Sequence, residues 1–245
     1  MYKSLKKIAK LIIPENILQK NEIFYRKLIS LKYKGVTHQC NICETKLNRF
    51  VELKGKDLLC PRCGSRSRTR RLYKILNETN TLKGKVLHFS PPRAVYEKFK
   101  KLSDITYFSS DFENEFVADY KYNITSIECE ADFFDLIICY HVLEHIEDDI
   151  EAMKELYRVL RPSGLCYIQT PLKEGDTYED ANITSKEGRK IAFEQEDHVR
   201  VYAVSGLNKR LESVGFKTEI KTFKQNNFEY NGLKQETILV AKKPS

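Results

Sequence analysis

The sequence predicts an open α/β sheet, and the clearest evidence lies in residues 134–171. The apolar run from Asp135 to Tyr140 is short and uninterrupted, as expected of a central parallel strand. Apolar residues then recur at three- and four-residue spacing from Asp148 to Leu160, which predicts an amphipathic helix. A Pro/Gly turn and a second apolar run, 165–170, follow at once. A strand, a crossover helix and a parallel strand in this order are the repeating unit of such a sheet.

The same alternation continues on both sides of this stretch. The remaining predicted elements of the sheet and its cover are strands at 85–89 and 105–109, a helix at 205–213, and a closing antiparallel pair at 216–223 and 237–241.

The composition is that of a globular chain with a full core. It has 245 residues, of which 41% are hydrophobic and 31% charged. No apolar run approaches the roughly 20 residues that cross a bilayer, and the basic start is followed by Pro14 and Glu15 without a cleavage site. We therefore expect a cytoplasmic protein whose seven cysteines are reduced thiols or metal ligands.

The formal charge of +8 is unevenly distributed. Residues 1–85 hold 21 Lys and Arg against 6 Asp and Glu, and the remainder holds 21 against 28. We predict amphipathic helices over residues 1–36, with apolar residues beside lysines, a pattern typical of a helix on an anionic surface. Two interpretations stay open: docking on the rest of this chain, and a peripheral membrane contact through residues 1–35.

Four cysteines form the clearest local motif. Two Cys-x-x-Cys pairs are separated by 16 residues, the spacing of a four-cysteine zinc site: Cys40, Cys43, Cys60 and Cys63. Within residues 37–80 the segment between the pairs turns at Gly55, as the hairpin of a zinc ribbon would, and Gly64 permits the backbone of the second turn. Four protein ligands complete a tetrahedral shell, so a Zn²⁺ ion here would be structural. The alternative is a pair of redox-active dithiols.

An arginine run follows the second cysteine pair and leads into an amphipathic helix. It comprises Arg66, Arg68, Arg70 and Arg71. These side chains could bind RNA phosphates or form a solvated face, and no aromatic RNA-binding signature accompanies them.

The order HVLEH after an aspartate-led strand, then ELYRVLRPSG, resembles the region after strand 4 of class I S-adenosylmethionine-dependent methyltransferases. The whole chain is similar to zinc-ribbon members of that family from bacterial polysaccharide gene clusters. The resemblance implies a Rossmann-like domain over residues 81–245 with a seven-stranded, mostly parallel sheet. It also implies S-adenosylmethionine as cofactor and a small-molecule acceptor such as a sugar or glycan precursor. Two alternatives stay open: an RNA methyltransferase, and a degenerate methyltransferase fold used as a binding module.

The resemblance also assigns cofactor positions. Ser90-Pro91-Pro92-Arg93 stands where the family has a glycine-rich loop, and Asp111 stands at the position of the ribose-binding carboxylate. The residues assigned to the cofactor are Ser90, Asp111, Asn123, Ile124 and Tyr140.

Two further stretches carry candidate catalytic residues. His141, Glu144 and His145 spell H-x-x-E-H, which also describes an inverted zinc-protease motif, although that motif needs both histidines on one helix. Residues 172–200 form a predicted insertion too polar for a sheet strand, which we interpret as a substrate lid.

Within the insertion, Phe193–Tyr202 resembles the family segment F-x-Q-x-D-H-V-R-x-Y. His198 beside Asp197 is a candidate general base, and His141 is the second catalytic candidate. His198 could equally serve only to order the loop.

Overall fold

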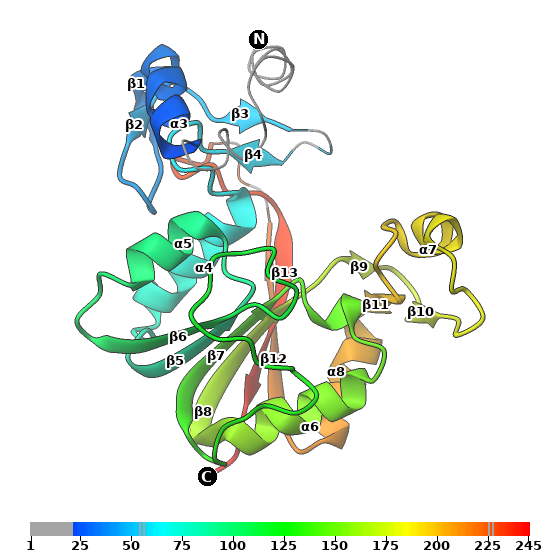
Figure 1. The fold of residues 1–245 in the computed structure, drawn as a ribbon. Coiled ribbons are helices and arrows are strands. Elements are labelled where there is room, and N and C mark those ends of the chain that lie inside the picture. The colour runs from blue at the N-terminus through cyan, green and yellow to red at the C-terminus, as the bar shows by residue number, and fades with distance from the viewer. Residues whose placement is uncertain (1–21, 54, 56, 225, 227) are drawn as a thin grey trace. The chain divides into compact units, whose positions relative to one another are not determined.

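A computed structural model describes residues 22–53, 55, 57–224, 226 and 228–245. The helices predicted before residue 22 lie outside the described residues. The chain forms two compact units, Met1–Thr79 with Phe223–Glu236, and Asn80–Thr222 with Thr237–Ser245 (Figure 1). Within the described ranges, no helix is both long and apolar enough to span a bilayer.

The first unit consists of short strands and two described helices. Its elements are α3 (Glu22–Ser30), η1 (Leu31–Tyr33), β1 (Lys34–Gln39), β2 (Lys46–Leu47), β3 (Val51–Glu52), β4 (Leu58–Leu59) and α4 (Ser67–Glu78). β1 pairs with β2 and β3 with β4, both antiparallel. The hairpin predicted between the two cysteine pairs is therefore present as β3 and β4.

The second unit is built on a six-stranded sheet in the order β12-β13-β8-β7-β5-β6. These strands are β5 (Gly84–Phe89), β6 (Ile105–Ser110), β7 (Phe134–Tyr140), β8 (Leu160–Gln169), β12 (Lys217–Phe223) and β13 (Glu236–Lys242). β6, β5, β7 and β8 are mutually parallel, and β13 runs antiparallel to β8. The predicted Rossmann-like, mostly parallel sheet is confirmed.

The prediction of seven strands differs from the sheet that the described residues form. Beside β6, at the edge of the sheet, Tyr120 makes a single parallel bridge with Ser110. Side chains take the place of the ladder: the Ser109 hydroxyl donates to Asp119 at 2.7 Å, and the amide of Tyr122 donates to the Ser110 hydroxyl at 2.9 Å. Such local side-chain bonds compete with strand pairing.

The insertion after β8 forms a small sheet of its own. Its elements are β9 (Leu172–Lys173), β10 (Tyr178–Glu179), α7 (Lys186–Phe193) and β11 (Arg200–Ala203), with strand order β10-β11-β9. We predicted no strand in residues 172–200, which was wrong for β9 and β10, although neither joins the central sheet. A strand of two residues pairs through its backbone and is too short to show the alternation of apolar and polar residues from which strands are predicted.

The core lies around β7 and the helix that follows it. The remaining helices of this unit are α5 (Arg93–Phe99), η3 (Leu143–His145), α6 (Asp149–Val159) and α8 (Val204–Ser213). β7 contributes Leu136, Ile137 and Ile138 to the buried interior, and α6 contributes Met153 and Leu156, which are fully buried. This is the apolar face that the helical spacing predicted, and it fixes the strand whose end carries the HVLEH segment.

We expect acid to destabilise the folded chain partly through His88 of β5. Complete burial lowers the pKa of His88 from 6.5 to about 3. Between pH 6.5 and about pH 3 the imidazole is therefore protonated in the unfolded state but neutral in the folded state. The free energy of unfolding should therefore fall by up to about 1.4 kcal/mol for each pH unit below the unfolded pKa. Urea unfolding from about pH 7 to about pH 4 should show a shallower slope for His88→Asn than for the wild type. Equal slopes would contradict the burial of a neutral imidazole.

Candidate functional site

The four predicted metal-ligating cysteines lie together in the first unit. Their sulfur atoms all lie within 4.8 Å of one another, with Cys40 Sγ 3.7 Å from Cys63 Sγ and Cys43 Sγ 3.8 Å from Cys60 Sγ. Tetrahedral zinc with bonds of about 2.3 Å separates its sulfurs by about 3.8 Å. The cluster therefore has the dimensions of a four-thiolate zinc site.

The two cysteine pairs have the same backbone turn. The amide of Glu44 donates to the carbonyl of Cys40 at 2.7 Å, and the amide of Gly64 donates to the carbonyl of Cys60 at 3.0 Å. Both turns need a positive φ, +79° at Gly64 and +60° at Glu44. The glycine was predicted from the sequence. Glu44 was not, because a glutamate gives no sign of a left-handed backbone.

Part of the arginine run is directed into the first unit rather than toward solvent. Arg70 is fully buried; its guanidinium donates to the carbonyls of Ser65 at 2.5 Å and Gly232 at 2.8 Å, and lies 4.1 Å from the ring centre of Phe50. Arg71 is also buried and donates to the carbonyl of Lys234 at 2.6 Å. These two arginines hold the segment between β12 and β13, so they are not available to RNA phosphates in this fold.

In the second unit, two predicted cofactor residues lie at the carboxyl ends of adjacent strands. Ser90 follows β5 and Asp111 follows β6, and the Ser90 hydroxyl donates to Asp111 Oδ1 at 2.9 Å. The amide of Phe116 donates to Asp111 Oδ2 at 3.0 Å. Asp111 is thereby held as a buried, hydrogen-bonded carboxylate. The sheet order reverses between β5 and β7, and ligands of open α/β sheets bind outside the carboxyl ends at this position.

The turn after β5 has the backbone of a glycine loop without its amide donors. Ser90 adopts φ +47°, and its amide donates to the carbonyl of Ser110 at 2.7 Å. Pro91 and Pro92 have no N–H group. Along this turn, no unused backbone donor precedes Arg93, the first residue of α5.

The segment assigned to the adenine forms a tight turn. Asn123 Oδ1 accepts from the amide of Thr125 at 3.1 Å and from its hydroxyl at 2.9 Å, while the side chain of Ile124 is buried. Between Asp111 and Asn123, the loop exposes the apolar side chains of Phe112 and Phe116. These flat apolar groups were not predicted as part of the site.

The turn after β7 brings together the H-x-x-E-H residues. His141 follows Tyr140 with φ +56°, and its Nδ1 donates to Glu144 Oε1 at 3.0 Å. Burial alone would raise the pKa of Glu144, but the hydrogen bond and charge of His141, together with a backbone hydrogen bond and the nearby His145, bring the pKa below its usual value. η3 contains His145 but not His141, so the one-helix geometry of an inverted zinc protease is absent.

The lid motif docks onto this turn. His198 is buried, and its Nδ1 donates to the carbonyl of Phe193 at 3.0 Å. The amide of the next residue, Val199, donates to the carbonyl of Glu144 at 2.9 Å. His198 thereby lies against His145, with ring centroids 4.7 Å apart. The two histidines, far apart in the chain, become neighbours.

Arg200 fixes the same turn through its carbonyls. Its guanidinium donates to the carbonyls of Leu143 at 3.3 Å, of Ile146, and of Glu147 at 2.8 Å. Its Nε donates to Glu179 of β10 at 2.8 Å. A lysine could not replace these contacts, because the planar guanidinium presents five donors in a fixed fork.

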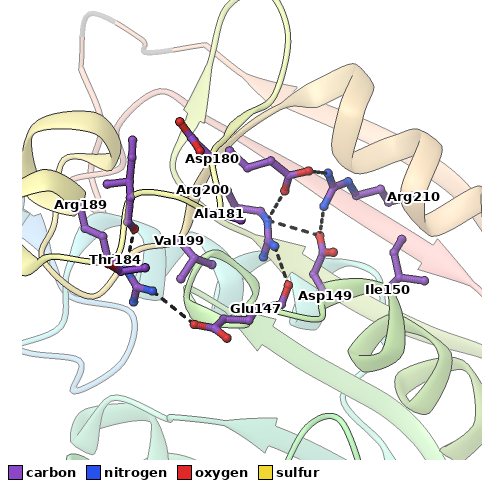
Figure 2. Close-up of a pocket in the computed structure, with 12 residues that line it drawn as sticks. Glu147, Asp149, Ile150, Asp180, Ala181, Thr184, Arg189, Val199, Arg200 and Arg210 are labelled. Carbon is purple, nitrogen blue, oxygen red and sulfur yellow. Dashed lines mark hydrogen bonds and ion pairs between the residues drawn. The ribbon is translucent and has the colours of Figure 1, made fainter.

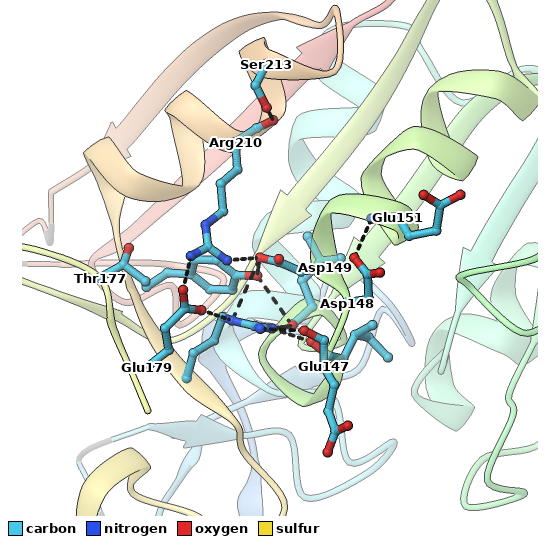
Figure 3. A network of polar contacts seen from close by, with 12 residues as sticks. Glu147, Asp148, Asp149, Glu151, Thr177, Glu179, Arg210 and Ser213 are labelled. Atoms are coloured by element: carbon cyan, nitrogen blue, oxygen red, sulfur yellow. Dashed lines mark hydrogen bonds and ion pairs between the residues drawn. The ribbon is translucent and has the colours of Figure 1, made fainter. Parts of the chain in front are cut away.

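The first residue of α6 anchors the rest of this polar network (Figure 3). Asp149 accepts hydrogen bonds from the Tyr202 hydroxyl and from Arg210 at 2.6 Å, and Arg210 also donates to Glu179 at 2.5 Å. A buried carboxylate is stabilised here by the positive end of the helix dipole as well as by its donors. Asp149 thus ties the lid and α8 to the start of α6.

A cavity of about 690 Å³ opens beside this network (Figure 2). Most of the side chains around it are charged. It is lined by Glu147, Asp149, Ile150, Glu179, Asp180, Ala181, Ile183, Thr184, Arg189, Val199, Arg200 and Arg210. Figure 2 shows the Arg189 side chain directed toward Glu147, which lies 3.3 Å away. A ligand here would meet charged, hydrogen-bonding groups as well as the apolar side chains of Ile150, Ile183 and Val199.

The comparisons with known proteins agree with this fold. Residues 69–219 match the sequence profile of a methyltransferase domain. Over 85 residues the chain is 31% identical to a probable S-adenosylmethionine-dependent methyltransferase of Mycolicibacterium smegmatis; this stretch is 35% of the chain and spans only 29% of that relative.

Two solved structures share the architecture. An S-adenosylmethionine-dependent methyltransferase from Archaeoglobus fulgidus matches with a TM-score of 0.50 at 16% identity, over 71% of this chain and 93% of that one. The [4+2]-cyclase SpnF matches with a TM-score of 0.53 at 14% identity, over 93% of this chain and 95% of that one. At these identities the likeness establishes the fold alone.

We expect Arg200→Lys to destabilise the chain by about 3 kcal/mol, because it leaves three carbonyls of the turn and the carboxylate of Glu179 without their donor. Urea unfolding measures the loss. Arg189→Lys is the matched control, since its partner Glu147 is largely exposed, and it should change stability by less than about 0.5 kcal/mol. Equal effects of the two substitutions would show that the lid is not held by Arg200.

Proposed function

Because the chain belongs to the methyltransferase-domain family, we propose that it transfers a methyl group from S-adenosylmethionine to a polar small molecule, such as a sugar or glycan precursor. The observation that carries the proposal is the position of Ser90, Asp111 and Tyr140 at the carboxyl ends of β5, β6 and β7. These three strand ends flank the point where the sheet order reverses, which is where such sheets bind nucleotides.

The residues present fit the cofactor. Asp111 is a hydrogen-bonded carboxylate whose remaining lone pairs suit the two ribose hydroxyls. The exposed rings of Phe112 and Phe116 offer a flat apolar surface to a purine. The turn of Ser90, Pro91 and Pro92 supplies no backbone N–H groups for the methionine carboxylate of the cofactor. The partly exposed guanidinium of Arg93, the next residue, is a positive charge that could bind this carboxylate instead. When bound, S-adenosylmethionine supplies an activated methyl group.

What remains for the chain's own residues is to orient the acceptor and exclude water. The cavity beside the lid supports a polar acceptor, since Arg189, Arg200, Glu179 and Asp180 line it. It lies next to the turn after β7, because Val199 lines the cavity and also donates to the carbonyl of Glu144. His198 is buried against this turn. This position supports a role in binding or deprotonating the acceptor over the alternative of only ordering the loop.

We also propose that the four-cysteine cluster binds one structural Zn²⁺. The sulfur separations match tetrahedral zinc, and four thiolates leave no position for a substrate. The buried guanidinium of Arg70 lies beside the cluster, where its charge offsets that of the thiolates. The zinc would thus hold the first unit together and take no part in the transfer.

A degenerate fold is the second candidate function, and the missing amide donors at Pro91 and Pro92 favour it. A sheet of this family can be retained as a binding module after cofactor affinity is lost. Cofactor binding by the zinc-loaded chain separates the two.

We expect S-adenosylmethionine and S-adenosylhomocysteine to bind the zinc-loaded chain with micromolar affinity in a calorimetric titration. Asp111→Asn should weaken both by about tenfold or more, because it removes a charged acceptor of two hydrogen bonds. Asp104→Asn, an exposed aspartate before β6, is the control and should bind as the wild type does. Failure of the wild type to bind either compound would favour the binding module. Unchanged affinity of Asp111→Asn would contradict the assignment of Asp111 to the ribose hydroxyls.

We expect the purified chain to hold one zinc ion, measured by atomic emission, and Cys60→Ser to lose it together with the cooperative unfolding of the first unit. Cys129→Ser, outside the cluster, should keep the metal. Retention of zinc by Cys60→Ser would contradict a site made by these four thiolates.

A further inference from the structure

A second group of metal-ligating side chains lies in the second unit. One carboxylate oxygen of Glu144 and one ring nitrogen each of His145 and His198 lie within 4.8 Å of one another. Glu144 and His145 come from the turn after β7, and His198 comes from the lid, 53 residues later. The contact of Val199 with Glu144 fixes this arrangement at the backbone level.

The contacts of His145 and His198 show which ring nitrogen of each histidine remains available to a metal ion. The carbonyl of Phe193 can only accept, so the proton of His198 is on Nδ1, and Nε2 keeps a lone pair. His145 Nδ1 lies 3.2 Å from the carboxylate of Asp197, which likewise accepts. Histidine ligands of metals characteristically donate their second N–H to a carbonyl or a carboxylate. These contacts leave Nε2 of both histidines to serve as the metal-binding atom.

Glu144 supplies the independent observation. It is 1% exposed, and His141 engages only its Oε1. Its Oε2 is buried and has no hydrogen-bond partner among the residues that the structure describes. A buried carboxylate oxygen without a donor is costly. A cation at this position would remove the cost.

The donor set selects the class of metal. Two imidazoles and one carboxylate suit first-row transition cations, whereas Mg²⁺ and Ca²⁺ prefer all-oxygen shells. Three protein ligands leave coordination positions open, in contrast to the closed four-cysteine shell. Such a cation could therefore accept oxygen ligands from a bound molecule.

We propose that Glu144, His145 and His198 bind a divalent transition-metal cation, whose open positions take adjacent hydroxyl oxygens of the acceptor. The metal site is inferred from the geometry alone, whereas the binding of the acceptor hydroxyls to the metal rests on the proposed methyl transfer. The charged cavity is lined by Val199, which follows His198 in the chain, and by Glu147, two residues after His145. The acceptor class is therefore a compound with vicinal hydroxyls, held by chelation as well as by hydrogen bonds.

Cobalt(II) is the probe, added to the full-length, zinc-loaded chain after loosely held metal has been removed with a chelator. We expect one further equivalent to bind, with visible d–d absorption and without the intense near-ultraviolet charge-transfer band that thiolate ligands give. Absence of this equivalent, or a spectrum of thiolate-bound cobalt alone, would overturn the site.

Matched variants locate the cobalt. Glu144→Gln preserves the shape of the side chain, and His198→Gln removes one imidazole; each should weaken cobalt binding by at least about tenfold, and Asp197→Asn by about tenfold through the orientation of His145. Glu78→Gln and His38→Gln, both in the first unit, are controls of the same residue types and should bind as the wild type does. Wild-type affinity in both Glu144→Gln and His198→Gln would refute the assignment.

Two further readings separate this inference from the proposed function. If S-adenosylhomocysteine binds in calorimetry but no further equivalent of cobalt does, only the metal site is refuted. If cobalt binds but S-adenosylhomocysteine does not, only the proposed function is refuted. Methyl α-mannoside, with adjacent hydroxyls, should shift the visible cobalt spectrum, whereas its 2,4-dideoxy counterpart, whose remaining hydroxyls are not adjacent, should not. No shift with either would overturn chelation of the acceptor.

Discussion

The contact between the lid motif and the turn after β7 is the constraint on which the candidate site depends. A strand that ends in an irregular turn leaves carbonyls without partners, and the guanidinium of Arg200 satisfies three of them at once. The amide of Val199 satisfies a fourth. This contact brings His198, from the lid, against Glu144 and His145.

Much of the fold could be predicted because burial leaves a periodic pattern. β7, α6 and β8 were located from their apolar spacing, and the Cys-x-x-Cys pairs from their separation. The sequence did not indicate that the described residues form six strands rather than seven, because the bonds made beside β6 by the side chains of Ser109 and Ser110 depend on tertiary placement. For the same reason the sequence indicated H-x-x-E-H and Asp197-His198 separately, and only the fold brings Glu144, His145 and His198 together.

The basic first unit shows where composition misleads. Its excess of Lys and Arg suggested a surface for anions, but Arg70 and Arg71 are buried donors to the carbonyls of residues 65 and 231–234. A buried guanidinium is tolerated because its five N–H groups find acceptors and its charge lies beside the cysteine cluster. Net charge counts such residues with the exposed ones and cannot distinguish a structural arginine from a binding one.

Hydrogen–deuterium exchange with and without S-adenosylhomocysteine tests the central claim most directly, namely that a cofactor binds at the carboxyl ends of β5, β6 and β7. The account predicts slower exchange of amides in residues 109–124 and 140–145, with no change at the opposite ends of the same strands. Protection confined to other segments, or no protection at a saturating concentration, would contradict it.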